Sequence, residues 1–204
     1  VITLLDALPR LPAESAGKPA IVIAGRLDPA LRDIVHRTVR DIRETHPELR
    51  LWLVDRFLSR GEIVATARRC SVILAPYQRF IGSSGVLIWA AALQRPVISQ
   101  NYGLLGRLIR ENGLGLTVDT SDPDALADAI AATIRDGADT LGRTDGMAMF
   151  AAARNREVFA SSILRCSATA PKSASRNGQN SIWNVDTDWS QDSTAYSQPK
   201  PEIT

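Results

Sequence analysis

Apolar and polar residues alternate along the chain in short blocks, and these blocks predict strands and helices in turn. Largely apolar runs predict strands at Ala20–Ala24, Leu49–Val54 and Ser71–Ala75. The first of these runs suits a strand that is buried on both faces. Further short strands are predicted at Pro96–Ser99 and in a segment that ends at Asp119.

Between these strands, apolar residues recur at helical spacing. Asp28 and Pro29 predict the N-cap and the first residue of a helix that continues to about Glu44. Alternating strands and helices predict an α/β fold, a Rossmann-like parallel sheet with helices on both faces. In such sheets, ligands bind outside the carboxyl ends of the strands. The other predicted helices are Gly61–Arg69, one that opens at the Gly82 loop, one bounded by Gly103 and Gly113, one from Pro123 behind a cap at Ser121 or Asp122, and Thr144–Leu164.

Changes in composition divide the chain into three parts. Residues 1–18 contain prolines and a glycine and are predicted to be the remnant of a linker, so that a domain is expected to precede them. Residues 19–165 are predicted to form one domain. Residues 166–204 are polar and aperiodic, which predicts a disordered tail. Trp183 and Trp189 in this tail are either incidental or able to dock a partner.

Charge and cysteine content exclude several classes of function. The net charge is only +2, and the basic residues, nearly all arginine, are spread among acidic ones, so no nucleic-acid surface is expected. No apolar stretch approaches the roughly 18 residues of a membrane helix. Cys70 and Cys166 fit free thiols in a reducing compartment, and with no visible signal peptide we expect a cytoplasmic protein. His36 and His46 have no partners at metal-ligand or triad spacing, so no metal site is predicted.

The Gly82–Val86 loop is the clearest chemical signal in the chain. Its sequence is Gly82, Ser83, Ser84, Gly85 and Val86, directly before a predicted helix. The first N–H groups of a helix lack partners within the helix and carry the positive end of its dipole, so they attract phosphate. The two glycines let an anion approach, and a serine caps the helix or donates to the anion. The alternative is a simple glycine-rich turn with a serine cap.

The order of three motifs resembles the donor-binding C-terminal half of GT-B glycosyltransferases, in particular the group 1 (family 4) retaining enzymes. The segment Ile23–Pro29 is similar to the turn that opens this domain. The segment Gly85–Ile98 is similar to its donor-loop helix and the strand that follows, and Asn112–Ile130 to its next strand and helix. These motifs occur in the family's order, and together the resemblance covers about residues 20 to 135.

This resemblance implies a site for a nucleotide-diphosphate sugar, which is the donor substrate, and it implies no further cofactor. Arg26 would pair with the donor diphosphate through its guanidinium, and the Gly82–Val86 helix start would hold the same phosphates. The alternative for Arg26 is a surface arginine in an ion pair. Arg32 could replace the second basic residue that the family has at the position of Leu31, or it could be a solvated helix arginine. The acceptor-binding N-terminal domain is expected to lie outside this chain.

Two positions depart from the family pattern. The family has two glutamates eight residues apart, and the aligned positions hold Ile81 and Trp89, which cannot accept hydrogen bonds as carboxylates do. Trp89 either packs on the apolar stripe of its helix or stacks on the nucleotide. Tyr77, with Gln78 and Arg79, follows a strand end and could line the donor pocket. No catalytic residue is assigned.

Three hypotheses of function follow. The first is the donor-binding domain of a glycosyltransferase, present as a fragment that is inactive alone. The second is a degenerate module that binds a nucleotide sugar or only a protein partner. The third is a different enzyme on a similar sheet, such as a nucleotide-sugar epimerase, because a fold does not dictate its function.

Overall fold

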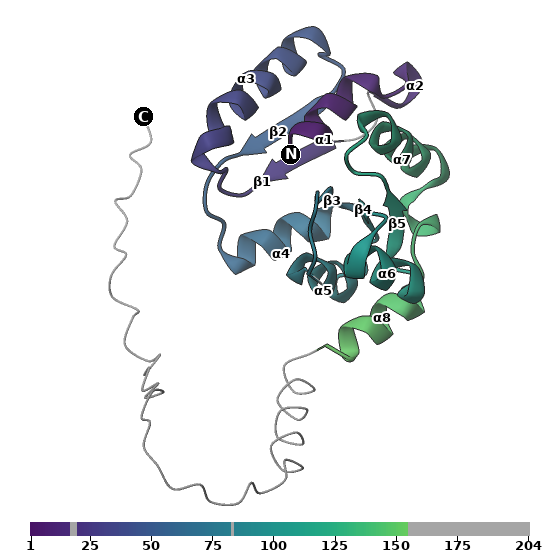
Figure 1. Cartoon of the computed structure of the whole chain (residues 1–204). Coiled ribbons are helices and arrows are strands. Elements are labelled where there is room, and N and C mark those ends of the chain that lie inside the picture. Colours follow the sequence, from purple (N-terminus) through teal and green to yellow (C-terminus); the bar gives the residue numbers. More distant parts are fainter. Residues whose placement is uncertain (17–19, 83, 155–204) are drawn as a thin grey trace, which may run out of the picture. The chain divides into compact units, whose positions relative to one another are not determined.

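The computed structural model describes residues 1–16, 20–82 and 84–154, all within a compact unit that spans Val1–Leu164 (Figure 1). The predictions for Ser83, for the end of the last helix and for the tail of residues 166–204 fall outside the described residues.

Parallel strands form two hydrogen-bonded sheets in the described part of the chain. One sheet pairs β1 (Ala20–Ala24) with β2 (Arg50–Val54). The other has the order β3 (Ile73–Ala75), β4 (Val97–Gln100) and β5 (Gly115–Val118). The predicted α/β class with parallel strands is therefore confirmed, although the strands are divided between two sheets.

Helices alternate with these strands as the hydrophobic pattern predicts. Asp28 and Asp122 cap helices α3 and α7 by accepting the N–H groups of Ala30 and Asp124, each at 2.9 Å, with proline at the start of both helices. Helix α4 begins with a capping box between Ser59 and Glu62. The helical elements are α1 (Ile2–Ala7), η1 (Leu8–Arg10), α2 (Ala13–Ala16), α3 (Pro29–Thr45), α4 (Arg60–Arg69), α5 (Gly85–Ala92), α6 (Gly103–Asn112), α7 (Pro123–Asp136), η2 (Ala138–Thr140) and α8 (Thr144–Ala152).

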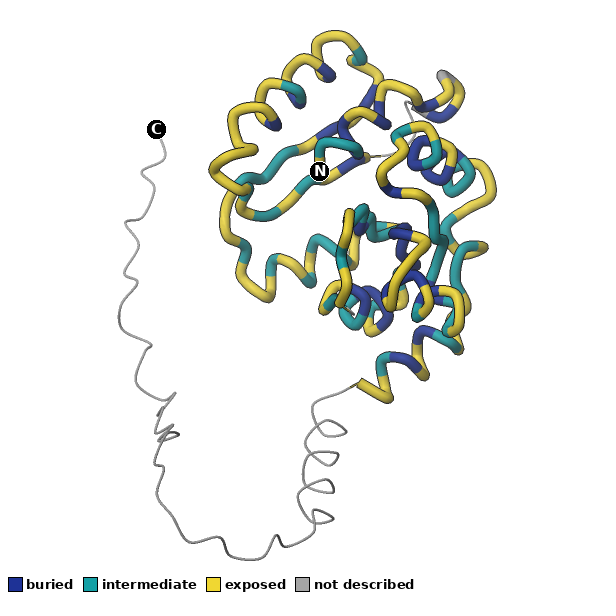
Figure 2. The backbone as a smooth tube through the Cα atoms, viewed as in Figure 1, coloured by how far each residue is buried: buried dark blue, intermediate teal, exposed yellow. Residues whose placement is uncertain are grey.

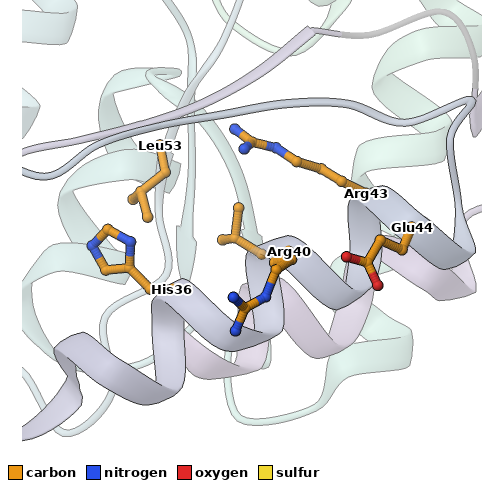
Figure 3. A pocket seen from close by; sticks show the side chains of 6 residues that line it. His36, Arg40, Arg43, Glu44 and Leu53 are labelled. Carbon is orange, nitrogen blue, oxygen red and sulfur yellow. The ribbon is translucent and has the colours of Figure 1, made fainter.

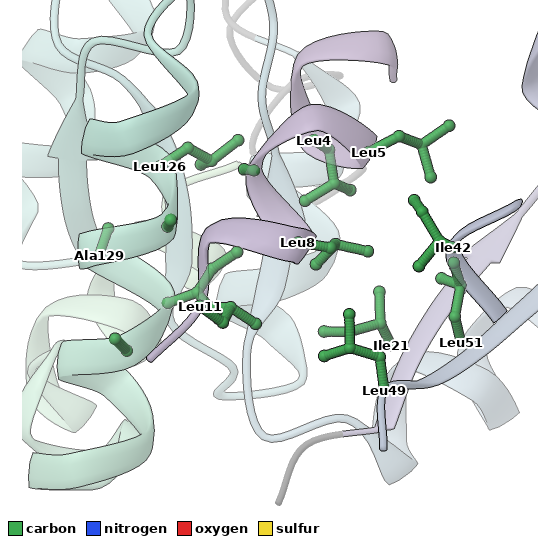
Figure 4. Close-up of a cluster of buried hydrophobic side chains, with 14 of the residues drawn as sticks. Leu4, Leu5, Leu8, Leu11, Ile21, Ile42, Leu49, Leu51, Leu126 and Ala129 are labelled. Carbon is green, nitrogen blue, oxygen red and sulfur yellow. The ribbon is translucent and has the colours of Figure 1, made fainter. Parts of the chain in front are cut away.

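Two clusters of buried side chains hold these elements together. The larger cluster joins α1, η1, α3 and α7 to β1 and β2 (Figure 4). It reaches the second sheet as well, because Ile98 of β4 belongs to it. The second cluster lies among α5, α6, α8 and the three-stranded sheet, and Leu87, Ile109 and Phe150 are almost fully buried there. The shared larger cluster is what packs the two sheets into one unit.

The N-terminal segment differs from the predicted linker. Leu5 and Leu8 of α1 and η1 are 0% and 1% exposed, and Leu4 and Leu11 are also buried in the larger cluster. Helix α1 packs against α7, and Arg10 pairs with Asp124 at 2.7 Å. Residues 1–11 therefore belong to the folded unit, because their leucines supply part of its core.

Strand β1 also differs from its prediction. Burial alternates along it, so that Ile21 is 8% exposed whereas Val22 is 41% exposed. Val22 lies opposite Trp52 of β2, which is 47% exposed. Helix α3 packs on β2, and α4, which follows β2, has no buried residue, as the exposed positions along α4 show (Figure 2). The two-stranded sheet is thus covered on one face only.

Two of the predictions from composition concern residues that the structure describes. No helix among those residues is both long enough and apolar enough to cross a membrane. Cys70 is a free, half-buried thiol, and burial raises its pKa.

Candidate functional site

The turn after β1 presents Arg26 to solvent. Gly25 has a φ of +137°, a conformation that side-chain-bearing residues rarely adopt, and a Cβ there would meet no atom within 4 Å. The Arg26 side chain is exposed and makes no hydrogen bond or ion pair with another described residue. The alternative of an ion-paired surface arginine therefore does not describe Arg26 within this part of the chain.

Asp55 fixes this turn by accepting a hydrogen bond from its backbone. The sequence alone did not identify Asp55 as a site residue. Asp55 follows β2 directly, its side chain is 8% exposed, and its Oδ1 accepts the Leu27 N–H at 2.9 Å. Its Oδ2 forms an ion pair with Arg32 Nε at 2.9 Å and lies 3.0 Å from His36 Nε2. A carboxylate immediately after a predicted strand was the signal available in the sequence, because parallel strands place such residues at the ligand-binding edge.

These contacts change the interpretation of Arg32 and His36. The Leu27 N–H, the His36 ring and the Arg32 guanidinium together hold the pKa of Asp55 below its usual range, against the effect of burial. Arg32 was a candidate for the donor pocket, but in this structure it is engaged with Asp55 as an intramolecular partner. His36, for which the sequence offered no partner, has one in Asp55.

The start of α5 is built as an open helix N-terminus. Ser84 is its N-cap, with a φ of +46°, and its Oγ accepts the Val86 N–H at 3.2 Å. A Cβ on Gly85 would meet no atom within 4 Å, and the Gly85 N–H makes no hydrogen bond with another described residue. An anion can therefore reach the first turn of this helix.

Tyr77 supports this helix start. Its hydroxyl lies 3.0 Å from Ser84 Oγ, and its ring stacks on Phe80 with the centroids 4.8 Å apart. The Phe80 ring in turn lies against Gly82, where a Cβ would come within 3.1 Å of it. These contacts give Tyr77 a role in holding the cap, whereas the sequence suggested that it lines the pocket.

Polar side chains, of which Gln100 and Thr120 are buried, hold the loop between β3 and α5. Gln100, fully buried at the end of β4, donates to the Phe80 carbonyl at 2.8 Å. Thr120 donates to the Tyr77 carbonyl, and Gln78 donates to the Thr120 carbonyl at 3.1 Å. The loop is therefore fixed from two neighbouring strand ends, which preorganises the start of α5.

Neither of the two positions at which the family has glutamates carries a carboxylate in this chain. Ile81 is 87% exposed in the loop before α5. Trp89 is half-buried and belongs to neither core cluster, and the Arg60 guanidinium carbon lies 5.7 Å from the centre of its ring. This arrangement is a cation–π contact between α4 and α5.

The predicted phosphate-binding groups follow the carboxyl ends of two strands, one from each of the two parallel sheets. Arg26 follows β1, and the loop that leads to Ser84 and Gly85 follows β3. No hydrogen bond or ion pair joins the Arg26 turn to the start of α5 in the described residues. The two groups therefore act together only through a ligand that reaches both.

A separate hollow of about 510 Å³ lies along α3 and β2 (Figure 3). His36, Arg40, Arg43, Glu44 and Leu53 line it together with Val39. The hollow does not include Arg26 or the start of α5. Among the residues that the structure describes, no group of three or more metal-binding side chains is found.

The fold and these strand-end loops define a Rossmann-like α/β protein with an anion-accessible helix start. A family model described as glycosyl transferases group 1 matches residues 1–136. The chain therefore belongs to the group 1 glycosyltransferase family.

Solved structures of GT-B glycosyltransferases share this fold. Anabaena HepE (Alr3699) in complex with UDP matches with a TM-score of 0.66 and 18% identity, over 83% of this chain and 45% of HepE. Sucrose-phosphate synthase from Thermosynechococcus elongatus matches with a TM-score of 0.61 and 26% identity, over 81% of this chain and 41% of that protein. The chain thus spans less than half of the length of these proteins. A comparison with curated proteins found no match.

Proposed function

We propose that this chain is the donor-binding domain of a glycosyltransferase. It holds a nucleotide-diphosphate sugar, whose sugar passes to an acceptor bound by another part of the full enzyme. Membership of the family supports this role. The observation that carries it is the exposed Arg26 guanidinium, which has no partner among the described residues and lies just beyond the carboxyl end of β1.

The chemistry of sugar transfer explains why such groups are useful. As the bond between the sugar and the phosphate breaks, negative charge builds on the leaving diphosphate. Arg26 donates two parallel hydrogen bonds to its oxygens, and the Gly85 N–H at the start of α5 donates another. Donors that are aimed at the leaving group before the bond breaks stabilise it without reorganisation. The proposal includes no metal or other cofactor.

The proposal assigns donor binding to this chain and leaves the acceptor site outside it. The chain spans 45% of HepE and 41% of the sucrose-phosphate synthase, so we place the acceptor-binding domain in the remaining part of a longer protein. Ile81 and Trp89 bring no carboxylate to the positions where the family has glutamates. The diphosphate contacts are therefore the part of the reaction that this chain performs. A cytoplasmic location stays a prediction.

Calorimetric titration tests this function. HepE has been solved with UDP and with UDP-glucose, which makes these two ligands suitable probes. We expect both to bind the chain, and Arg26→Ala to weaken both by about tenfold or more, the scale of a lost charge-assisted hydrogen bond. Arg37→Ala is the matched control, because Arg37 is an exposed arginine on α3.

The control separates loss of a specific contact from loss of general positive charge. Arg37→Ala leaves the affinity for UDP within about twofold, as expected for an exposed charge away from the ligand. Equal affinities in the unaltered chain and Arg26→Ala would remove Arg26 from the diphosphate site. Absence of UDP binding in the unaltered chain would refute the proposed function.

A further inference from the structure

The backbone on both sides of Arg26 is tied to the end of β2. The Gly25 N–H donates to the Val54 carbonyl at 3.0 Å, and the Leu27 N–H donates to Asp55 Oδ1 at 2.9 Å. The Arg26 side chain itself is exposed and has no partner among the described residues. The turn therefore holds the backbone of Arg26 and leaves its guanidinium available.

The two carboxylate oxygens of Asp55 have different partners. Oδ1 accepts the turn N–H of Leu27, while Oδ2 forms an ion pair with Arg32 Nε at 2.9 Å and lies 3.0 Å from His36 Nε2, both on α3. A carboxylate that is 8% exposed needs such partners, because an ion removed from water without them is costly. The lowered pKa of Asp55 agrees with a carboxylate that stays ionised.

Arg32 and His36, the side chains that contact Asp55, are much more exposed than Asp55 itself. Arg32 and His36 are 44% and 52% exposed, so water can solvate them when Asp55 is removed. The Leu27 N–H has no such freedom, because its hydrogen bond closes the turn next to Arg26. Loss of Asp55 therefore changes the direction of the turn more than it changes the environment of Arg32 or His36.

From this geometry we infer that Asp55 is a positioning residue for donor binding, which fixes the turn so that Arg26 points at the diphosphate. This inference rests on the proposed function and adds to it a residue that contacts no substrate. Asp55 acts through Arg26, so its effect on affinity requires Arg26 to be present.

A double-mutant cycle tests this dependence by calorimetric titration with UDP. The four proteins are the unaltered chain, Asp55→Ala, Arg26→Ala and the double variant. We expect Asp55→Ala to weaken UDP binding about fivefold, and to change it by less than about twofold in the Arg26→Ala background. A purely structural role would weaken binding equally in both backgrounds, and that result would overturn the inference.

A conservative variant and a second readout keep the test decisive if Asp55→Ala folds poorly. In Asp55→Asn, the amide oxygen still accepts the Leu27 N–H while the charge is lost. We expect Asp55→Asn to retain UDP affinity within about twofold of the unaltered chain, with slow hydrogen exchange at the Leu27 amide. Asp33→Ala, which removes an exposed aspartate of α3, is the control and leaves both measurements unchanged.

The outcomes distinguish this inference from the proposed function. If the chain binds UDP and Arg26→Ala weakens it while Asp55→Ala does not, the positioning role of Asp55 fails and the donor site stands. If Asp55→Asn lowers affinity while the Leu27 amide stays protected, the turn is not the route of the effect and the inference also fails. If the unaltered chain does not bind UDP, both fail together.

Discussion

The two sheets of this protein are built from similar apolar strands but are buried to different extents. All four residues of β4, the central strand of the three-stranded sheet, are buried. In the two-stranded sheet, burial alternates, and the facing pair Val22 and Trp52 stays 41% and 47% exposed. The comparison shows that an apolar run predicts a strand but does not predict how many of its faces are covered.

The difference arises from the helices that follow the strands. Helices α5 and α6 bury residues such as Leu87 and Leu105 against the three-stranded sheet. Helix α4, which follows β2, buries none of its residues and begins with a polar capping box. The more exposed half therefore gains less from apolar burial, and it is also the half that carries Arg26 and Asp55.

The largest expected effect on stability comes from substituting two glycines. Gly25 follows β1 of the two-stranded sheet, and Gly115 begins β5 of the three-stranded sheet. Gly115 and Gly25 have φ values of +149° and +137°, so alanine is strained at both. A Cβ on Gly115 would lie 2.0 Å from the Val97 carbonyl oxygen, whereas one on Gly25 meets nothing within 4 Å. We expect Gly115→Ala to destabilise by about 4 kcal/mol or more and Gly25→Ala by about 1–3 kcal/mol, measured by urea unfolding. Similar losses for both would contradict the difference in packing between the sheets.

The next largest effect on stability is expected when aliphatic side chains in the two sheets are shortened to alanine. Ile98 of β4 is 1% exposed and Val22 of β1 is 41% exposed. Ile98→Ala should lower the free energy of unfolding by about 2–5 kcal/mol, because it leaves a cavity in the larger core cluster. Val22→Ala should cost less than about 1 kcal/mol, since its site is open to water. A cost for Val22→Ala as large as that for Ile98→Ala would mean that another part of the chain covers this face.

The smallest effect concerns the cap of α4. The pKa of Glu62 is lowered to about 2, because Arg56 Nη2 donates to it at 2.6 Å and the Ser59 N–H and hydroxyl donate to it as well. A lowered pKa stabilises the fold fully above the unfolded value of 4.5, and this contribution is lost as the pH falls toward 2. Glu62→Gln should therefore lower the melting temperature at about pH 7, with the difference from the unaltered chain narrowing below about pH 4. A difference that is constant with pH would show that the cap does not depend on the charge.

Most of the fold between residues 20 and 136 could be predicted from the sequence, because the signals there are local. Asp28 before Pro29, and Ser121 or Asp122 before Pro123, marked helix starts that the structure confirms, with Asp122 as the N-cap of α7. Helix α1 could not be predicted in the same way. It has six residues and lies close to Pro9, so only its packing against α7 shows that Leu5 is part of the core.

The candidate site was predictable to a similar degree. Glycine and serine before an apolar run indicated the helix start at Ser84 and Gly85, since capping is a short-range property. The partners of Asp55 lie 28, 23 and 19 residues away in the chain, at Leu27, Arg32 and His36. Such contacts depend on the pairing of β1 with β2, which no local pattern specifies.

Chemical-shift mapping with UDP tests the proposed donor site most directly. In amide spectra of the isotope-labelled chain, UDP should shift the backbone signals of Gly25, Leu27, Gly85 and Val86 most strongly, because they flank Arg26 or start α5. The same shifts should be reduced in Arg26→Ala. Shifts confined to the hollow lined by His36 and Arg40, or no shifts at all, would contradict a diphosphate site between the β1 turn and α5.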